Sequence, residues 1–156
     1  MEEGKETIHN HQQTHEEVRR EQFYLAAQEI VQTIMENDNA LCFWEPVNPE
    51  VEYAPNYYLI IPSPMCFFEV QEKLDQKKYN CPEEFIEDVR TIWQNAKIYN
   101  NPSHQIYKTA HNLANKFEIL ASTLPHTLSE SEKNSGLQRL VELRFQRYRM
   151  NKPTHQ

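Results

Sequence analysis

Apolar residues recur every three or four positions in four stretches of the chain. These stretches cover residues 16–37, 65–77, 81–100 and 106–120. That spacing lines the apolar side chains along one face of an α-helix and leaves polar residues on the other face. Only two glycines occur in the 156 residues, which disfavours a sheet protein built on tight glycine turns. The pattern therefore predicts an all-α domain with four helices around one core.

The helical pattern disappears between residues 39 and 64, where five prolines occur. The same segment is rich in bulky apolar side chains, namely Phe43, Trp44, Val47, Tyr53, Tyr57, Tyr58, Ile60 and Ile61. A mobile polar linker would not carry so many apolar side chains, so we expect the segment to fold back and bury them. Long connections of this kind are usually functional, and this one is expected to form one wall of a pocket. The alternative is a packed loop that only covers the end of the bundle.

The third helical stretch ends at a polar residue whose position is set by a proline. Pro82 suits the first position of this helix. Pro102 disfavours helical geometry at the residue before it, so the helix is predicted to end within residues 99–101. The side-chain amide of Asn100 is thereby presented at a helix terminus. Asparagine is also a common helix C-cap, which is the purely structural interpretation of the same residue.

Three short motifs occur in the order and spacing of a known family. They are Pro-Val at residues 46–47, the run YYLII at residues 57–61 with Pro-Met at residues 64–65, and Tyr-Asn at residues 99–100. Together these motifs resemble the bromodomain, the acetyl-lysine reading module, and the resemblance covers residues 16–124. It implies a left-handed four-helix bundle with a long aromatic and proline-rich loop between the first two helices.

The resemblance also implies a function and a site. The function is non-catalytic recognition of N-ε-acetylated lysine in histone tails or other nuclear proteins, in chromatin and transcription regulation within the nucleus. The residue in the position of Asn100 donates a hydrogen bond to the acetyl carbonyl, and the residue in the position of Tyr57 reaches that carbonyl through a water. The other implied site residues are Phe43, Val47, Asn95, Ala96, Tyr99 and Ile106, with the last as gatekeeper. An amide donor in an apolar slot suits neutral acetyl-lysine and penalises the charged ammonium of unmodified lysine.

Several positions depart from the family pattern. Leu-Cys-Phe at residues 41–43 stands where the family usually has Trp-Pro-Phe, with a tryptophan displaced to Trp44. Glu52 and Ala54 occupy loop positions that are often apolar. We expect these changes to reshape the shelf beside the pocket and to widen and acidify its channel.

Charge and cysteine content narrow the classes of partner. The net charge is −7, and residues 23–124 carry fourteen acidic and seven basic residues, which disfavours phosphate binding and suits a basic peptide. The three cysteines form no CxxC pair, so we expect reduced thiols and neither a metal site nor a cofactor. No run of eighteen apolar residues and no signal-peptide pattern occurs, so an intracellular chain without membrane association is expected.

The two ends of the chain fall outside the predicted domain. Residues 1–15 are polar and are expected to be disordered. Residues 125–156 carry three acidic and six basic residues, and they are expected to form a linker and a basic amphipathic helix. This helix is expected to dock on the bundle, or else to contact a protein partner or nucleic acid.

Three other functions fit parts of the sequence. An aromatic cage for methyl-lysine could be built from Trp44, Tyr53, Tyr57 and Tyr58. A cysteine with His104 or His111 could form a nucleophile and base, although the chain contains no GxSxG, HExxH or glycine-rich phosphate motif. A helical scaffold would use the loop and the basic C-terminal segment only to bind proteins, and Asn100 would then be dispensable for binding.

Overall fold

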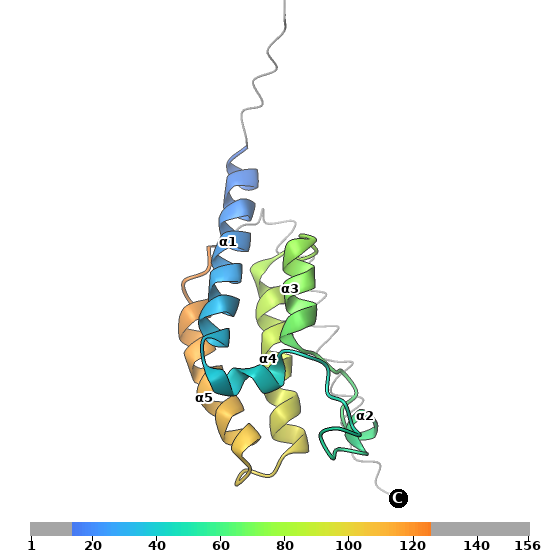
Figure 1. Cartoon of the computed structure of the whole chain (residues 1–156). Helices are drawn as coiled ribbons and strands as arrows, with labels where there is room; N and C mark the ends of the chain where they lie inside the picture. Colours follow the sequence, from blue (N-terminus) through green and yellow to red (C-terminus); the bar gives the residue numbers. More distant parts are fainter. Residues whose placement is uncertain (1–13, 126–156) are drawn as a thin grey trace, which may run out of the picture.

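The computed structural model describes residues 14–125, which form a bundle of four long helices with two short helices in the first connection (Figure 1). In chain order the elements are α1 (His15–Met35), the 3-10 helix η1 (Asp38–Phe43), α2 (Tyr57–Ile60), α3 (Phe67–Asp75), α4 (Pro82–Tyr99) and α5 (Gln105–Ala121). No strand occurs between residues 14 and 125. The prediction of an all-α domain with four main helices is confirmed.

The start of α1 lies slightly earlier than the sequence pattern predicted. The Thr14 side chain accepts a hydrogen bond from the backbone N–H of Glu17 at 3.2 Å, and the Glu17 carboxylate accepts one from the backbone N–H of Thr14 at 3.0 Å. This capping box pairs N–H groups that a helix start otherwise leaves without partners. Thr14 and His15 therefore belong to the helix start. The predictions for the polar segment 1–13 and for the basic segment 126–156 lie outside the described residues.

Large aromatic side chains from all four long helices fill the space between them. Phe85 of α4 packs edge-on against Phe23 of α1 and Phe117 of α5, with ring centroids 6.1 and 6.0 Å apart. Phe67 of α3 contacts Trp93 of α4 at a centroid distance of 5.4 Å. All five side chains are buried. Burial of a side chain of this size stabilises the fold by roughly 1.5–3 kcal/mol, so this core holds α4 and α5 in fixed positions.

The connection between α1 and α3, residues 36–66, is called the long loop here. It contains η1 and α2, which the helical pattern did not predict because neither is longer than about two turns. The Asn37 side chain accepts a hydrogen bond from the backbone N–H of Asn39 at 3.0 Å and so caps η1. Figure 1 shows α2 beside the lower end of the bundle, away from α1. Local hydrogen bonds and short helices thus give the long loop a defined shape.

The long loop is tied to the bundle at both of its ends. The Phe43 ring meets the Trp93 ring edge-on, with centroids 5.2 Å apart. The backbone carbonyl of Trp44 accepts a hydrogen bond from the backbone N–H of Phe68 at 2.9 Å. Toward its other end the loop has a small apolar cluster of its own, made of buried Ala54, Tyr57 and Ile61 with partly buried Val47 and Tyr99. Tyr99 belongs to α4, so this second cluster also joins the loop to the bundle.

Candidate ligand-binding cavity

A cavity of about 360 Å³ lies between the long loop and the adjoining ends of α4 and α5. Its volume falls in the range of small-ligand sites. Seven of the eight residues predicted for the site line it, namely Phe43, Val47, Tyr57, Ala96, Tyr99, Asn100 and Ile106. Nine further residues also line it, namely Cys42, Glu45, Glu52, Tyr53, Ala54, Met65, Ile92, Asn101 and His104.

Asn100 ends α4 at the edge of the cavity. Its backbone is extended, with φ −96° and ψ 146°, so the tolerance of asparagine for left-handed geometry does not explain its presence here. Both its backbone N–H and its side-chain Nδ2 donate to the carbonyl of Ala96, each at 3.0 Å. A side-chain amide carries two N–H donors. One of them fixes the orientation of the group, and the other can serve a ligand in the cavity.

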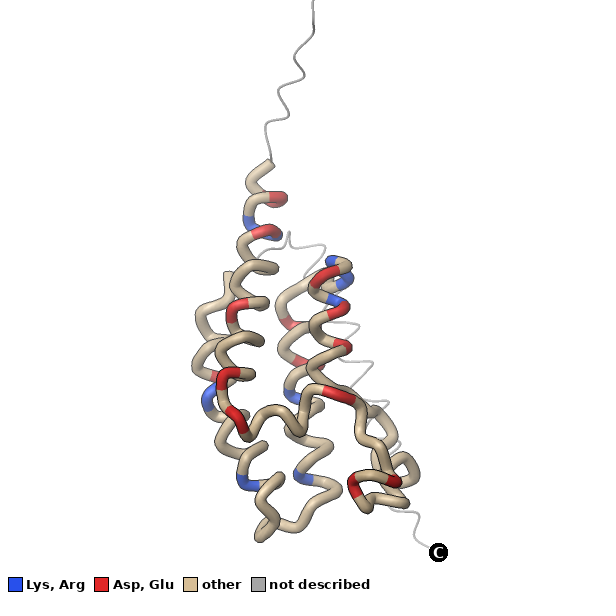
Figure 2. The backbone as a smooth tube through the Cα atoms, in the orientation of Figure 1, with Lys and Arg blue, Asp and Glu red and all other residues tan. Residues whose placement is uncertain are grey.

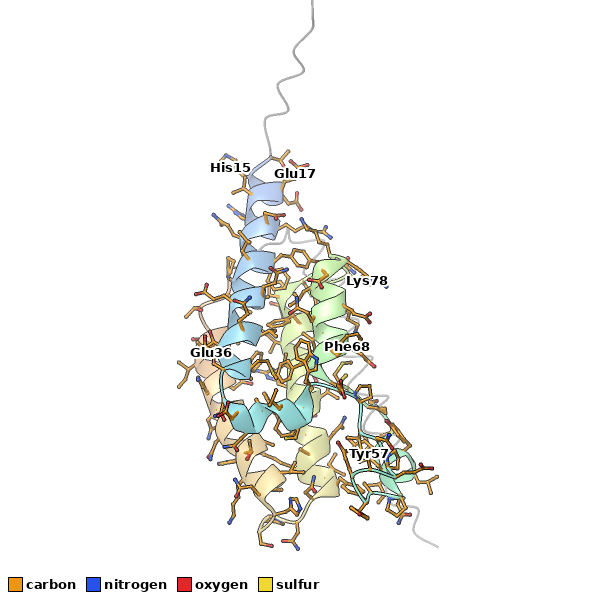
Figure 3. The ribbon with its side chains drawn as sticks, viewed as in Figure 1. His15, Glu17, Glu36, Tyr57, Phe68 and Lys78 are labelled. Carbon is orange, nitrogen blue, oxygen red and sulfur yellow. The ribbon has the colours of Figure 1, made fainter. Side chains whose placement is uncertain are left out.

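Tyr57 lines the same cavity from the long loop. Figure 3 shows Tyr57 in the part of the loop beside the lower end of α4. Its ring packs edge-on against Tyr58 and Tyr99, with centroids 5.3 and 5.1 Å apart, and its side chain is only 7% exposed. Burial is the main cause that raises the pKa of Tyr57 to about 12, so its hydroxyl is protonated at neutral pH. Among the described residues this hydroxyl makes no hydrogen bond, which leaves it able to pair with a water or ligand in the cavity.

Asn95, the eighth predicted residue, is not among the residues that line the cavity. Its Nδ2 donates to the backbone carbonyl of Ser63 at 2.7 Å, at the C-terminal end of the long loop. Five residues of α-helix turn the side-chain direction by roughly 140°, so Asn95 and Asn100 leave α4 on different sides. The buried Asn95 amide therefore anchors the loop to α4.

The departures in the 41–43 segment change the wall of the cavity. Leu41 is exposed, Phe43 is buried against Trp93, and Cys42 lines the cavity. The displaced Trp44 packs edge-on against Phe68 at 6.4 Å and is not a lining residue. The small thiol of Cys42 thus occupies the position where the family pattern has a proline. Trp44 packs against α3 instead of lining the cavity.

The exposure of the lining residues separates an apolar interior from an acidic rim. Phe43, Tyr57, Ile92 and Ala96 are buried, whereas Glu45 and Glu52 are exposed. Partial desolvation of its carboxyl group raises the pKa of Glu52. Among residues 14–125, no lysine or arginine lines the cavity. A neutral group is therefore favoured inside the cavity, and positive charge is favoured at its opening.

Two of the alternative functions find little support in this geometry. Of the four aromatic residues proposed for a methyl-lysine cage, only Tyr53 and Tyr57 line the cavity. Cys66 and Cys81 are buried, and burial raises the pKa of both thiols, which disfavours the reactive thiolate. Within residues 14–125 no hydrogen bond joins a cysteine to a histidine. His104 instead accepts a hydrogen bond from the backbone N–H of Ile106 at 3.1 Å and caps α5.

Across residues 14–125, no three His, Cys, Asp or Glu side chains come together in a group that could hold a metal ion. None of the helices in the same range has the length and apolar character needed to cross a membrane.

A helical bundle with a small cavity at one end, lined by an oriented amide and by apolar side chains, has the features of a ligand-binding module. The sequence model of the bromodomain family matches residues 27–112, which is more than half of the 156 residues. The chain belongs to the bromodomain family, a family of non-catalytic binding modules.

Several curated proteins are similar to the chain over the same region. An ankyrin repeat, bromo and BTB domain-containing protein of Dictyostelium discoideum is 33% identical over 57% of this chain and 11% of its own length. Transcription factor GTE9 of Arabidopsis thaliana is 33% identical over 64% of this chain and 14% of its own length. Chromatin structure-remodeling complex subunit rsc1 of Schizosaccharomyces pombe is 37% identical over 43% of this chain and 8% of its own length. The similarity thus covers a small part of each relative.

Proposed function

We propose that residues 16–124 bind N-ε-acetylated lysine in histone tails or other nuclear proteins, without catalysing a reaction. The observation that carries the proposal is the presence of both Asn100 and Tyr57 in the lining of one cavity. An acetyl-lysine carbonyl needs a donor, which the second N–H of the oriented Asn100 amide supplies. The protonated hydroxyl of Tyr57 supplies a second donor through a water molecule.

The apolar interior accounts for selectivity toward the acetylated form. The aliphatic stem and the methyl group of acetyl-lysine gain from contact with Phe43, Val47 and Ile106, which line the cavity. An unmodified lysine would bring an ammonium among these side chains and opposite an amide N–H donor. That group would lose hydration without gaining an acceptor, which disfavours its entry.

A chromatin setting is supported by the relatives. One is named a transcription factor and another a subunit of a chromatin structure-remodeling complex. We infer a nuclear location and a histone-type partner on that basis. The matched region is only 14% and 8% of those two proteins, so the proposal concerns what this domain binds.

The test is calorimetric titration of a lysine peptide in acetylated, unmodified and trimethylated forms. The wild-type chain is expected to bind the acetylated form preferentially. Asn100→Ala is expected to weaken that binding by about tenfold to a hundredfold, because a buried carbonyl would lose its donor. Asn115→Ala, which removes an exposed amide of α5 that does not line the cavity, is the matched control and should bind as the wild type does.

Two results would contradict the proposal. One is equal binding of the acetylated and unmodified peptides by the wild type. The other is unchanged affinity in Asn100→Ala, with the fold shown to be intact by circular dichroism. Preference for the trimethylated peptide would instead support the aromatic-cage alternative.

Cys42 offers an independent measure of cavity occupancy. It is the exposed thiol among the three cysteines and it lines the cavity, whereas Cys66 and Cys81 are buried. Alkylation followed by mass spectrometry should therefore modify Cys42 first. A bound acetylated peptide should slow that modification, and the unmodified peptide should not.

A further inference from the structure

We propose that the loop wall of the cavity selects acetyl-lysines that have an arginine one or two residues away, and that Glu52 and Tyr53 bind the guanidinium of that arginine. The inference rests on the proposed acetyl-lysine function and adds the sequence class of the ligand to it. Glu52 and Tyr53 are adjacent in the chain, line the cavity and are exposed, which places them where a bound peptide leaves the cavity.

The Tyr53 ring is held out in solvent by a fixed turn. It is 92% exposed, and its φ of 54° lies in the left-handed region, which is uncommon for a bulky side chain. Hydrogen bonds on both sides fix this geometry, from the backbone N–H of Glu52 to the Asn48 carbonyl at 3.0 Å and from the backbone N–H of Ala54 to the Pro49 carbonyl at 2.9 Å. An exposed aromatic face in a rigid turn can stack with a planar cation at a low entropic cost.

Every Asp, Glu, Lys or Arg in the long loop, which carries this ring, is acidic. The long loop contains five acidic residues, Glu36, Asp38, Glu45, Glu50 and Glu52, and no lysine or arginine. Figure 2 shows the acidic positions of this loop near α2 without a basic position among them. Glu52 forms no ion pair within the described residues, and Glu45 lies on the same cavity rim. A cation arriving with the ligand would therefore meet carboxylates that are not already neutralised.

A second observation inside the cavity indicates that a ligand belongs there. The Tyr57 side chain is 7% exposed, and its hydroxyl makes no hydrogen bond among the described residues while its side chain lines the cavity. With the acetyl group held between Tyr57 and Asn100, the peptide backbone lies at the rim. Successive Cα atoms are about 3.8 Å apart, so an arginine one or two positions away can reach the loop wall.

Arginine is favoured over lysine by its shape. A guanidinium can lie flat on the Tyr53 ring and at the same time present two N–H groups to the Glu52 carboxylate. A lysine ammonium is a compact, non-planar charge, so it cannot both stack on the ring and pair with the carboxylate through two parallel N–H groups. Glutamate at the same peptide position would be repelled by Glu45 and Glu52.

The experiment measures affinities of the full chain for matched peptides that each carry one acetyl-lysine. Arginine, citrulline or glutamate is placed in turn at the two positions before and the two positions after the acetyl-lysine. Citrulline keeps the shape of arginine and removes its charge. At one or more positions the arginine peptide is expected to bind about fivefold more tightly than the citrulline peptide.

Two variants test the assigned residues, and a third serves as control. Glu52→Gln and Tyr53→Ala should each reduce the ratio of the two affinities, arginine peptide over citrulline peptide, to about twofold or less. Glu50→Gln removes one negative charge from the same loop at a residue that does not line the cavity, and it should retain the preference. Glu52→Lys should bind the glutamate peptide more tightly than the arginine peptide.

The outcomes separate this inference from the proposed function. Acetyl-dependent binding with equal affinity for arginine and citrulline peptides at all four positions would overturn the inference and leave the proposed function in place. The same conclusion would follow if the preference survived in both Glu52→Gln and Tyr53→Ala. Absence of acetyl-dependent binding for every peptide would overturn both.

Discussion

The two walls of the cavity belong to regions of the molecule that are stabilised in different ways. The helical wall, at the ends of α4 and α5, continues into the bundle core. Within residues 14–125 this core contains 22 buried residues from α1, η1, α3, α4 and α5 and their connections. The loop wall depends on a second cluster of three buried residues, Ala54, Tyr57 and Ile61. Local opening has a lower free-energy cost where fewer apolar groups are buried. The donor Asn100 thus lies in the more rigid region. The loop wall can shift more easily as a whole, while its hydrogen-bonded turn keeps Glu52 and Tyr53 in place relative to each other.

This difference suits a binding module. A ligand carbonyl needs a hydrogen-bond donor at a fixed position. The end of α4 supplies this donor, because the backbone N–H and the side-chain amide of Asn100 both donate hydrogen bonds to the Ala96 carbonyl. Neighbouring residues of different ligands vary in shape, and a loop with its own small cluster can adjust to them without disturbing the core. Three contacts nevertheless limit that adjustment: Phe43 on Trp93, Asn95 to Ser63, and Tyr57 on Tyr99.

The largest effect is expected from Phe85→Ala in the bundle core. The Phe85 side chain is 0% exposed and its ring meets those of Phe23, Tyr79 and Phe117. Removing it should lower the free energy of unfolding by about 3–5 kcal/mol, because both buried area and packing contacts are lost. Urea unfolding followed by circular dichroism measures the change. A loss below about 1 kcal/mol would contradict the central place of this ring in the core.

A smaller and more local effect is expected from Ile61→Ala in the loop cluster. Ile61 is buried, yet the cluster around it is small and can rearrange. The free energy of unfolding should fall by roughly 2 kcal/mol, at the low end for such a change. Hydrogen exchange should speed up mainly in the long loop, and affinity for the acetylated peptide should fall with it. Equally faster exchange in α4 would show that loop and bundle open as one unit.

The helical wall could be predicted from the sequence, because its signals are local. Ile92, Ala96 and Tyr99 follow one another at spacings of four and three residues, which places them on one face of α4, and Pro102 fixes where that helix ends. Ile92 could have been added to the predicted site on this spacing alone. His104 could have been found as a capping residue two positions before Ile106.

For the loop wall, the sequence predicted that the segment forms one side of a pocket, but its pattern alone could not predict which of its residues line that pocket. Which of its residues face the cavity depends on contacts between residues distant in sequence, such as Phe43 with Trp93 and Ser63 with Asn95. The local spacing of apolar residues carries no information about such long-range pairs. The resemblance to the family supplied Val47 and Tyr57, but it also placed Asn95 in the site. In the structure that amide donates to the Ser63 carbonyl and is not among the residues that line the cavity.

A modest effect on stability and ligand binding is expected from Tyr58→Phe, which removes one hydrogen bond within the long loop. The Tyr58 hydroxyl donates to the Val47 carbonyl at 2.5 Å, and Val47 lines the cavity. Loss of this partly exposed hydrogen bond should lower the free energy of unfolding by about 0.5–1 kcal/mol. The acetylated peptide should dissociate faster, as measured by surface plasmon resonance, because Val47 is held less firmly. Tyr107→Phe is the control, since the Tyr107 hydroxyl makes no hydrogen bond among the described residues.

The smallest effect on stability is expected from Glu118→Gln, a change at a residue that does not line the cavity. Arg90 of α4 donates two hydrogen bonds to the Glu118 carboxylate of α5, at 2.7 and 2.8 Å, but the two side chains are 38% and 47% exposed. After allowance for solvent screening, losing the pair should lower the free energy of unfolding by less than about 1 kcal/mol. Peptide affinity should not change, because neither residue lines the cavity.

The pH dependence of this pair has a defined sign. The hydrogen bonds from Arg90 lower the pKa of Glu118 in the folded protein. The stabilisation is therefore fully present above the pKa of an unfolded glutamate, about 4.3, and is lost as the pH falls through the lower folded value. The difference in unfolding free energy between wild type and Glu118→Gln should shrink as the pH falls from 7 toward 3, and added salt should shrink it at pH 7. A difference that grew on acidification would show that the carboxylate is stabilised in the unfolded chain rather than by Arg90.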